Sequence, residues 1–133
     1  MNAHKDKGTR FETAVVRYLR AMTGDPSIDR MALHGGEDEG DITGLTFRGR
    51  DVVVECKDTR RPDLTEHLRE ARREAMNHRK AGHPTVCGIL VQHAPGVGTT
   101  RMGDQWVAMT LADLVGILTE ANKAMEGGHD DDR

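Results

Sequence analysis

Two charged side chains near the middle of the chain have the types and spacing of a catalytic pair. Glu55 and Lys57 stand two apart at the end of residues 51–57, a valine-rich run typical of a strand. Because side chains alternate along a strand, both lie on one face, whereas Val54 and Cys56 lie on the other. Burying such charges is costly unless something pairs with them, and a metal ion is one solution. The alternative is an ordinary ion pair at the end of a strand.

The acid-x-lysine spacing arises by chance roughly once in a chain of this composition, so its surroundings decide its meaning. The turn Arg48-Gly49-Arg50 precedes the strand. If this turn is a three-residue hairpin loop, Asp41 lies opposite Lys57 and Thr43 lies opposite Glu55. Asp41 and Glu55 are then diagonal neighbours on one face, with Cα atoms about 7 Å apart. A two-residue turn would place Asp41 on the wrong face.

Two carboxylates at this distance can close onto one cation. Together with the backbone carbonyl of Cys56 they form a hard oxygen site, suited to Mg²⁺ or Mn²⁺. Such an ion lowers the pKa of a bound water and stabilises a pentavalent phosphate. Lys57 can orient the nucleophile or neutralise the developing charge. Asp41, Glu55 and Lys57 therefore predict metal-dependent phosphodiester hydrolysis.

The elements that must position these residues follow the order α-β-β-β-α-β-β-α. The periodicity predicts helices over residues 9–22, 63–80 and 110–125, and strands over 28–34, 41–47, 51–57, 85–92 and 105–109. A helix between the third and fourth strands permits a right-handed crossover, which makes these strands parallel within a mixed sheet. We expect an α/β fold, with residues 1–8 as a flexible arm, 9–126 as one domain and 127–133 as a disordered acidic tail.

The motif and the order of elements resemble a known superfamily. Gly40-Asp41, then thirteen residues, then Glu55-Cys56-Lys57 is similar to the PD-(D/E)xK nuclease signature, with glycine where the motif name has proline. Glu12 on the first helix and the small size resemble the archaeal-type Holliday junction resolvases and their phage relatives. The resemblance implies a restriction-endonuclease-like core and metal-dependent cleavage of branched DNA. It makes Asp41 and Glu55 metal ligands and Lys57 the catalytic lysine, with Glu12 as a further catalytic acid and candidate ligand.

Several of these residues also have a structural interpretation. Glu12 stands three after Thr9, the spacing of a helix capping box. Residues 37–39 are all acidic and are better interpreted as a solvated loop than as extra ligands. The alternative functions are a restriction or repair nuclease that acts on duplex DNA, and a catalytically inactive DNA-binding or assembly module of the same fold.

Candidate DNA contacts follow from charge. Residues 57–80 carry eight Lys or Arg against five acids, although the whole chain has a net charge of −3. Arg60 and Arg61 directly follow the proposed active-site strand and are the best candidates. The second helix also carries glutamates at 66, 70 and 74, so ordinary ion pairing of its arginines is the competing interpretation. The remaining candidates are Lys5, Lys7, Arg10, His34, Arg69, Arg72 and Arg73.

Composition narrows the other function classes. The 133 residues include four aromatic rings among Phe, Tyr and Trp, too few for a base-stacking platform. Two cysteines in apolar runs predict reduced core thiols, and neither a signal peptide nor a membrane span is visible, so we expect a cytoplasmic protein without membrane contact. Resolving a four-way junction needs two symmetric cuts, which predicts a homodimer. Its surface could come from the helix with Leu111, Leu114, Val115 and Leu118 or from the strand with Trp106, unless both complete the core.

Overall fold

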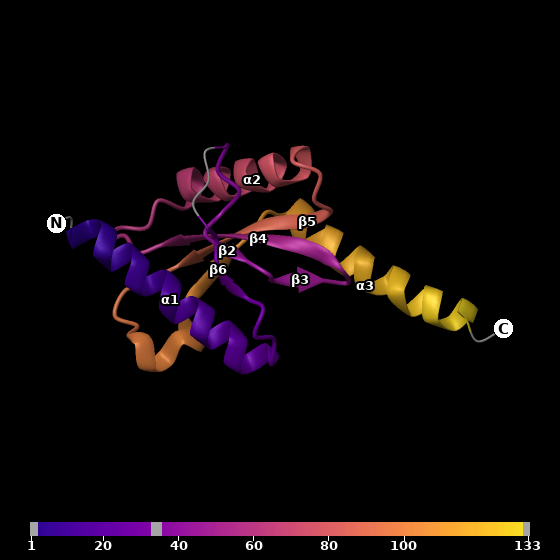
Figure 1. Cartoon of the computed structure of the whole chain (residues 1–133), viewed down its shortest axis with the longest axis horizontal. Coiled ribbons are helices and arrows are strands. Elements are labelled where there is room, and N and C mark those ends of the chain that lie inside the picture. Colours follow the sequence, from indigo (N-terminus) through magenta and orange to yellow (C-terminus); the bar gives the residue numbers. More distant parts are fainter. Residues whose placement is uncertain (1–2, 33–35, 132–133) are drawn as a thin grey trace.

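A mixed six-stranded sheet flanked by helices makes this an α/β protein (Figure 1). The computed structural model describes residues 3–32 and 36–131. The sheet order is β1-β2-β4-β5-β6, and β3 also pairs with β4. The elements are α1 Ala3–Thr23, β1 Asp29–Arg30, β2 Ile42–Thr43, β3 Thr46–Phe47, β4 Arg50–Lys57, α2 Leu64–Lys80, β5 Thr85–Gln92, the 3₁₀ helix η1 Thr99–Asp104, β6 Trp106–Ala108 and α3 Leu111–Asp131.

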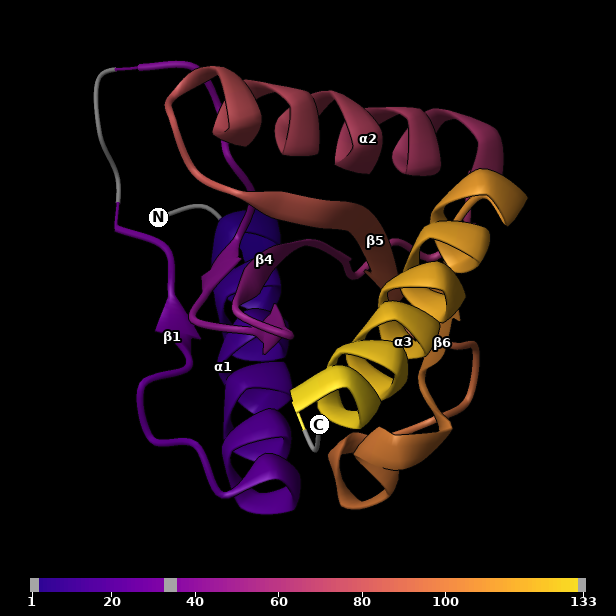
Figure 2. The ribbon, with the colours of Figure 1, turned by 90° about the vertical axis from the view of Figure 1, so that its right-hand side faces the viewer.

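The two faces of the sheet are covered by different helices. The helix α2 lies along one face of β4 and β5, and α1 lies on the opposite side (Figure 2). Gly88 of β5 allows the close approach of α2, because a Cβ atom there would collide with the backbone of Ala71 and the side chain of Ala75. The helix α3 packs against β5, and its Ile117 borders the core on the α1 side.

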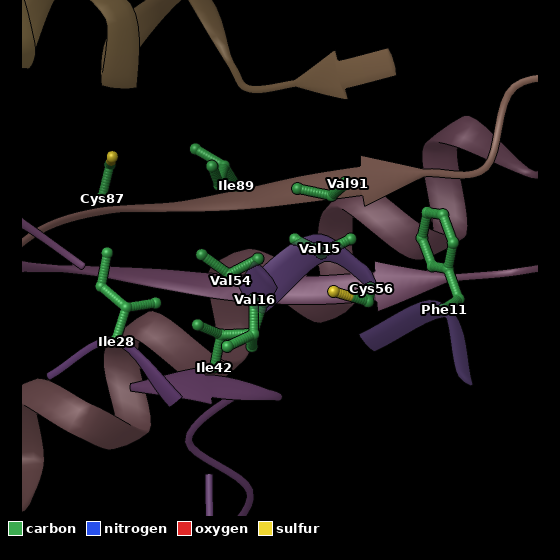
Figure 3. Packing of buried hydrophobic residues seen from close by; sticks show 10 residues of the cluster. All are labelled: Phe11, Val15, Val16, Ile28, Ile42, Val54, Cys56, Cys87, Ile89 and Val91. Carbon is green, nitrogen blue, oxygen red and sulfur yellow. The ribbon is translucent and has the colours of Figure 1, made fainter. Parts of the chain in front are cut away.

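The hydrophobic core lies between α1 and the sheet (Figure 3). Its strand side chains come from alternate positions of β4 and β5, because successive side chains of a strand point to opposite faces of the sheet. The buried members are Phe11, Val15, Val16, Ile28, Ile42, Val54, Cys56, Cys87, Ile89 and Val91. Both cysteines are free and buried, which confirms the predicted core thiols.

Strands β4 and β5 were predicted more accurately than the other strands and the chain ends. Strand β5 has the predicted bounds, and β4 and β5 pair in parallel through the α2 crossover, as expected. The arm expected over residues 1–8 is wrong for residues 3–8, because α1 begins at Ala3. The tail expected over residues 127–133 is likewise wrong for residues 127–131, because α3 continues to Asp131. The run 41–47 forms two short strands, β2 and β3, rather than one.

The hairpin before β4 differs from the prediction. Phe47 pairs with Arg50, so the turn has two residues, Arg48 and Gly49, both with positive φ as a type I′ turn requires. The predicted pairing of Asp41 with Lys57 and of Thr43 with Glu55 is therefore wrong. Ile42 instead pairs with Val54.

A bulge in the strand segment before β4 places Asp41 on the same face as Glu55. Between the Thr46–Asp51 and Ile42–Val54 pairs, the first strand has one more residue than β4. Gly44 occupies this irregularity with φ of 88°, and a Cβ atom there would strike Ser27 and Ile28. The inserted residue reverses the effect of the shorter turn, so Asp41 returns to the vicinity of Glu55.

In the part of the chain that the structure describes, no helix is both long enough and apolar enough to cross a bilayer.

Candidate metal centre

Asp41 lies where β2 and β4 separate. Its backbone N–H donates to Val54 O at 2.8 Å, and its Oδ2 accepts from the Cys56 N–H at 2.8 Å. In a regular antiparallel ladder the Cys56 N–H would donate to a backbone carbonyl of the neighbouring strand. Here the Asp41 carboxylate accepts this hydrogen bond instead. Asp41 therefore binds the backbone on both sides of Glu55, and the two strands hold these two acids together as predicted.

Glu55 is the buried carboxylate of the site. Its residue is 3% exposed and lies on the face of β4 that α2 covers. Burial raises the pKa of Glu55 well above its usual range, and the neighbouring carboxyls of Asp41, Glu74 and Glu70 raise it further. A cation at this position would remove much of that electrostatic cost.

Lys57 is the ammonium group at the edge of this acidic site. Its Nζ lies 3.9 Å from Glu55 Oε2 and 2.6 Å from Glu70 Oε2. Desolvation alone would lower the pKa of Lys57, but the Glu70 hydrogen bond and the charge of Glu55 raise it overall. The pKa of Glu70 is lowered by its interactions with Glu55 and Lys57. Lys57 is therefore held as a cation beside Glu55.

Glu12 approaches the site from α1. Burial and the charge of Asp41 raise the pKa of Glu12, while Arg30 opposes the shift through a contact of 3.1 Å between its Nε and Glu12 Oε2. The capping box proposed for Glu12 and Thr9 is wrong, because α1 begins at Ala3 and Thr9 lies inside the helix. Glu12 therefore lies between Asp41 and a competing arginine.

Two acids of the site were missed in the sequence. Glu70 and Glu74 lie on α2 and were assigned to surface ion pairs with arginines, but both contact the β4 side chains instead. Glu74 is 1% exposed, and neither of its carboxylate oxygens has a hydrogen-bond partner within the described residues. The available signal was its position on the same helical stripe as Ala71, Ala75 and His78, which are also buried.

The acidic loop before Asp41 is fixed to α2. Asn77 Nδ2 donates to Asp38 O at 2.8 Å, and a ring nitrogen of His78 lies 2.7 Å from Glu39 Oε1. Carboxylate oxygens of Asp38, Glu55 and Glu74 lie within 4.8 Å of one another. Residues 37–39 were interpreted as a solvated loop, but Asp38 and Glu39 make specific contacts with α2.

His78 also connects this loop to the sheet. Its other ring nitrogen lies 2.7 Å from Asp51 Oδ2, and its ring stacks on His83 with centroids 4.3 Å apart. With Glu39, the two histidines form a second group of potential metal ligands. The two carboxylates already occupy both ring nitrogens of His78, so the group serves as a clamp between the loop, α2 and β4.

The predicted DNA contacts fall into three groups. Arg10, Arg60, Arg61 and Arg73 are exposed. Three others form ion pairs: Lys7 with Asp58 at 3.6 Å, Arg69 with Glu66 at 3.8 Å and Arg72 with Asp113 at 3.4 Å. The third group cannot be placed, because His34 and the side chain of Lys5 lie outside the described residues.

The donors of the centre are all oxygens, as a hard divalent cation prefers, and both carboxylate oxygens of Glu74 lack a hydrogen-bond partner within the described residues. Comparisons with protein-family models, curated proteins and solved structures found no match for this chain.

Proposed function

We propose that this chain is a divalent-metal-dependent endodeoxyribonuclease with a restriction-endonuclease-like core, and in particular a Holliday junction resolvase. One observation carries the proposal: the backbone N–H of Cys56 fixes the Asp41 carboxylate beside the buried Glu55, and Lys57 follows on the same strand face. Buried carboxylates without enough counter-charge are costly and are characteristic of functional sites.

The proposed roles follow from position. Asp41 and Glu55 would hold Mg²⁺ or Mn²⁺ with the Cys56 carbonyl, and Glu12 is a further candidate ligand. The ion would supply an activated water and neutralise charge on the phosphate. Lys57, held as a cation at 25% side-chain exposure, would orient the nucleophile or stabilise negative charge that develops on the phosphate.

The DNA would approach over the loop that follows β4. Arg60 and Arg61 are exposed there, three and four residues after Lys57, and no ion-pair partner contacts them within the described residues. Two free guanidinium groups beside a metal centre suit phosphate contacts. Replacing both with alanine should weaken binding and flatten its salt dependence by about one unit per lost contact.

A homodimer would provide the two cuts that a four-way junction requires. The apolar side chains named in the sequence do not complete the core: Leu111, Val115 and Leu118 of α3 are 77%, 52% and 54% exposed, and Trp106 of the edge strand β6 is 54% exposed. Such a surface is suited to a second copy with two-fold symmetry. Light scattering with and without junction DNA should show a dimer.

Cleavage of two DNA substrates tests the proposal. Four-way junction and linear duplex DNA of equal length are incubated with the protein in Mg²⁺ or in EDTA, alongside Asp41→Asn and Glu55→Gln. We expect Mg²⁺-dependent cleavage and preferential binding of the junction, with both variants inactive but folded, because they lose ligand charge and keep side-chain shape. Cleavage at the wild-type rate by either variant would refute the site. Equal binding of both DNAs by a monomer would refute the resolvase assignment alone, and binding without cleavage would indicate a DNA-binding module.

A further inference from the structure

Glu74 is a buried carboxylate on the face of α2 that meets the sheet. It is 1% exposed, both of its oxygens lack hydrogen-bond partners among the described residues, and its helical neighbours Ala71 and Ala75 pack against the sheet. Burying a carboxylate without a partner costs several kcal/mol in general. A bound cation would remove this cost and let Glu74 stay ionised at neutral pH.

The groups closest to Glu74 are other oxygen donors. Glu55 and Asp38 each place a carboxylate oxygen within 4.8 Å of Glu74 and of each other. Lys57 does not compensate these three charges fully, because it makes its short contact of 2.6 Å with Glu70. Three carboxylates converge here from three different elements.

The position of Asp38 is fixed by contacts beyond its carboxylate. Its carbonyl oxygen accepts from Asn77 on α2 at 2.8 Å, and its Oδ1 accepts from the Gly40 N–H at 2.9 Å. Asn77 and His78 follow Glu74 by about one helical turn, and both contact the loop that carries Asp38. The helix that supplies Glu74 therefore also anchors Asp38 next to it.

We propose that Asp38, Glu55 and Glu74 form a second divalent-cation site that shares Glu55 with the Asp41 site. Three carboxylates constitute a hard oxygen site for Mg²⁺ or Mn²⁺, because a donor set without sulfur or imidazole does not favour softer metals. The catalytic role of this second site rests on the proposed nuclease function. In that role, the bridging carboxylate would hold two ions near the scissile phosphate. Cation binding itself can be measured without DNA.

Counting bound Mn²⁺ by electron paramagnetic resonance on the DNA-free protein tests the proposal. We expect two Mn²⁺ per wild-type chain, with spectral broadening because ions bridged by Glu55 lie close together. Glu74→Gln and Asp38→Asn should each retain one ion and lose the broadening. Asp41→Asn should also retain one ion, at the other position. Glu66→Gln is the matched control, an exposed acid on the same helix, and should retain two.

The same variants separate this proposal from the nuclease assignment. If the wild type binds one Mn²⁺ and Glu74→Gln still binds it, the second site is refuted whether or not DNA is cleaved. If the wild type binds two ions, Glu74→Gln binds one and no DNA is cut, the second site stands and the nuclease assignment fails. If Glu74→Gln does not fold, Asp38→Asn tests the same site, because Asp38 is exposed and its replacement should not disturb the core.

Discussion

The two faces of β4 and β5 differ in what they bury. Toward α1 the strands present valine, isoleucine and cysteine side chains to an apolar core. Toward α2 they present Glu55 and Gln92 beside Glu74 and His78 of the helix, all buried polar or charged groups, together with the buried apolar Val53 and Leu90. The same pair of strands therefore supports stability on one face and a charged centre on the other.

The packing of the helices explains how one sheet can do both. On the α2 face, Gly88 and the small residues Ala71 and Ala75 let the helix approach closely. This close contact buries Glu74, which is 1% exposed, next to Glu55. The α1 face provides apolar contact area in return, so the core on that side offsets the cost of the charges.

The largest expected difference between the faces concerns activity. Lys57→Ala should lower the rate of junction cleavage by about a hundredfold or more, while junction affinity changes little, because its proposed role is in the transition state. Lys80→Ala, an exposed lysine at the end of α2, is the control and should cleave normally. Single-turnover rates and binding isotherms measure the two effects, and an equal loss in both would assign Lys57 to DNA binding.

The apolar face should respond in stability instead. Ile28→Ala removes a side chain that is 1% exposed in the core and should lower the free energy of unfolding by about 3 kcal/mol. Met22→Ala on the same side of the molecule is 68% exposed and should change it by less than about 0.5 kcal/mol. Urea denaturation at constant pH measures both, and a small effect of Ile28→Ala would contradict the assigned division between the faces.

The pH dependence of stability should reveal the charged face. Burial raises the pKa of Glu74 from 4.5 to about 8, with further contributions from Asp38 and Asp41, whereas the interaction with Glu55 opposes the shift. The folded state thus holds a proton that the unfolded chain releases above pH 4.5. This stabilisation is fully present below pH 4.5 and is lost as the pH rises through about 8.

In EDTA, Glu74→Gln should therefore reduce the loss of stability between pH 5 and pH 8 by about 3 kcal/mol. Glu66→Gln should leave the pH profile unchanged, because Glu66 is exposed. Urea denaturation at a series of pH values measures the slopes. Identical slopes for Glu74→Gln and the wild type would show that Glu74 is ionised in the folded state.

How much the sequence could predict also differs between the faces. The alternation of β4 placed Glu55 and Lys57 on one face and Cys56 on the other, because it depends on residues adjacent in the chain. Strand β5 was located correctly for the same reason. The arginine-rich sequence around Glu70 and Glu74 indicated surface ion pairs, although Glu74 shares a helical stripe with Ala71 and Ala75, which pack against Gly88 far along the chain. Long-range packing determined which charges were buried.

The hairpin shows the same limit. The two-residue turn follows from the backbone of Arg48 and Gly49, but the bulge at Gly44 depends on contact with Ser27 and Ile28. The prediction placed Asp41 near Glu55 through a register that the structure does not have. Two local differences cancelled, so the proximity of Asp41 and Glu55 was predicted correctly and their strand pairing incorrectly.

The smallest expected effect concerns Glu12, the acid that the α1 side contributes to the centre. Arg30→Ala removes a half-exposed ion pair with Glu12 and should lower the free energy of unfolding by less than about 1 kcal/mol. If Glu12 binds metal, losing this competitor should raise the apparent Mn²⁺ affinity severalfold, because the carboxylate no longer has to leave Arg30. Arg20→Ala, which removes the neighbouring ion pair with Asp29 at 3.4 Å, is the control and should leave the affinity unchanged. Calorimetric titration with Mn²⁺ distinguishes the two roles. An unchanged affinity in Arg30→Ala would confine Glu12 to its ion pair and leave the proposed metal ligands to β4, α2 and the loop before β2.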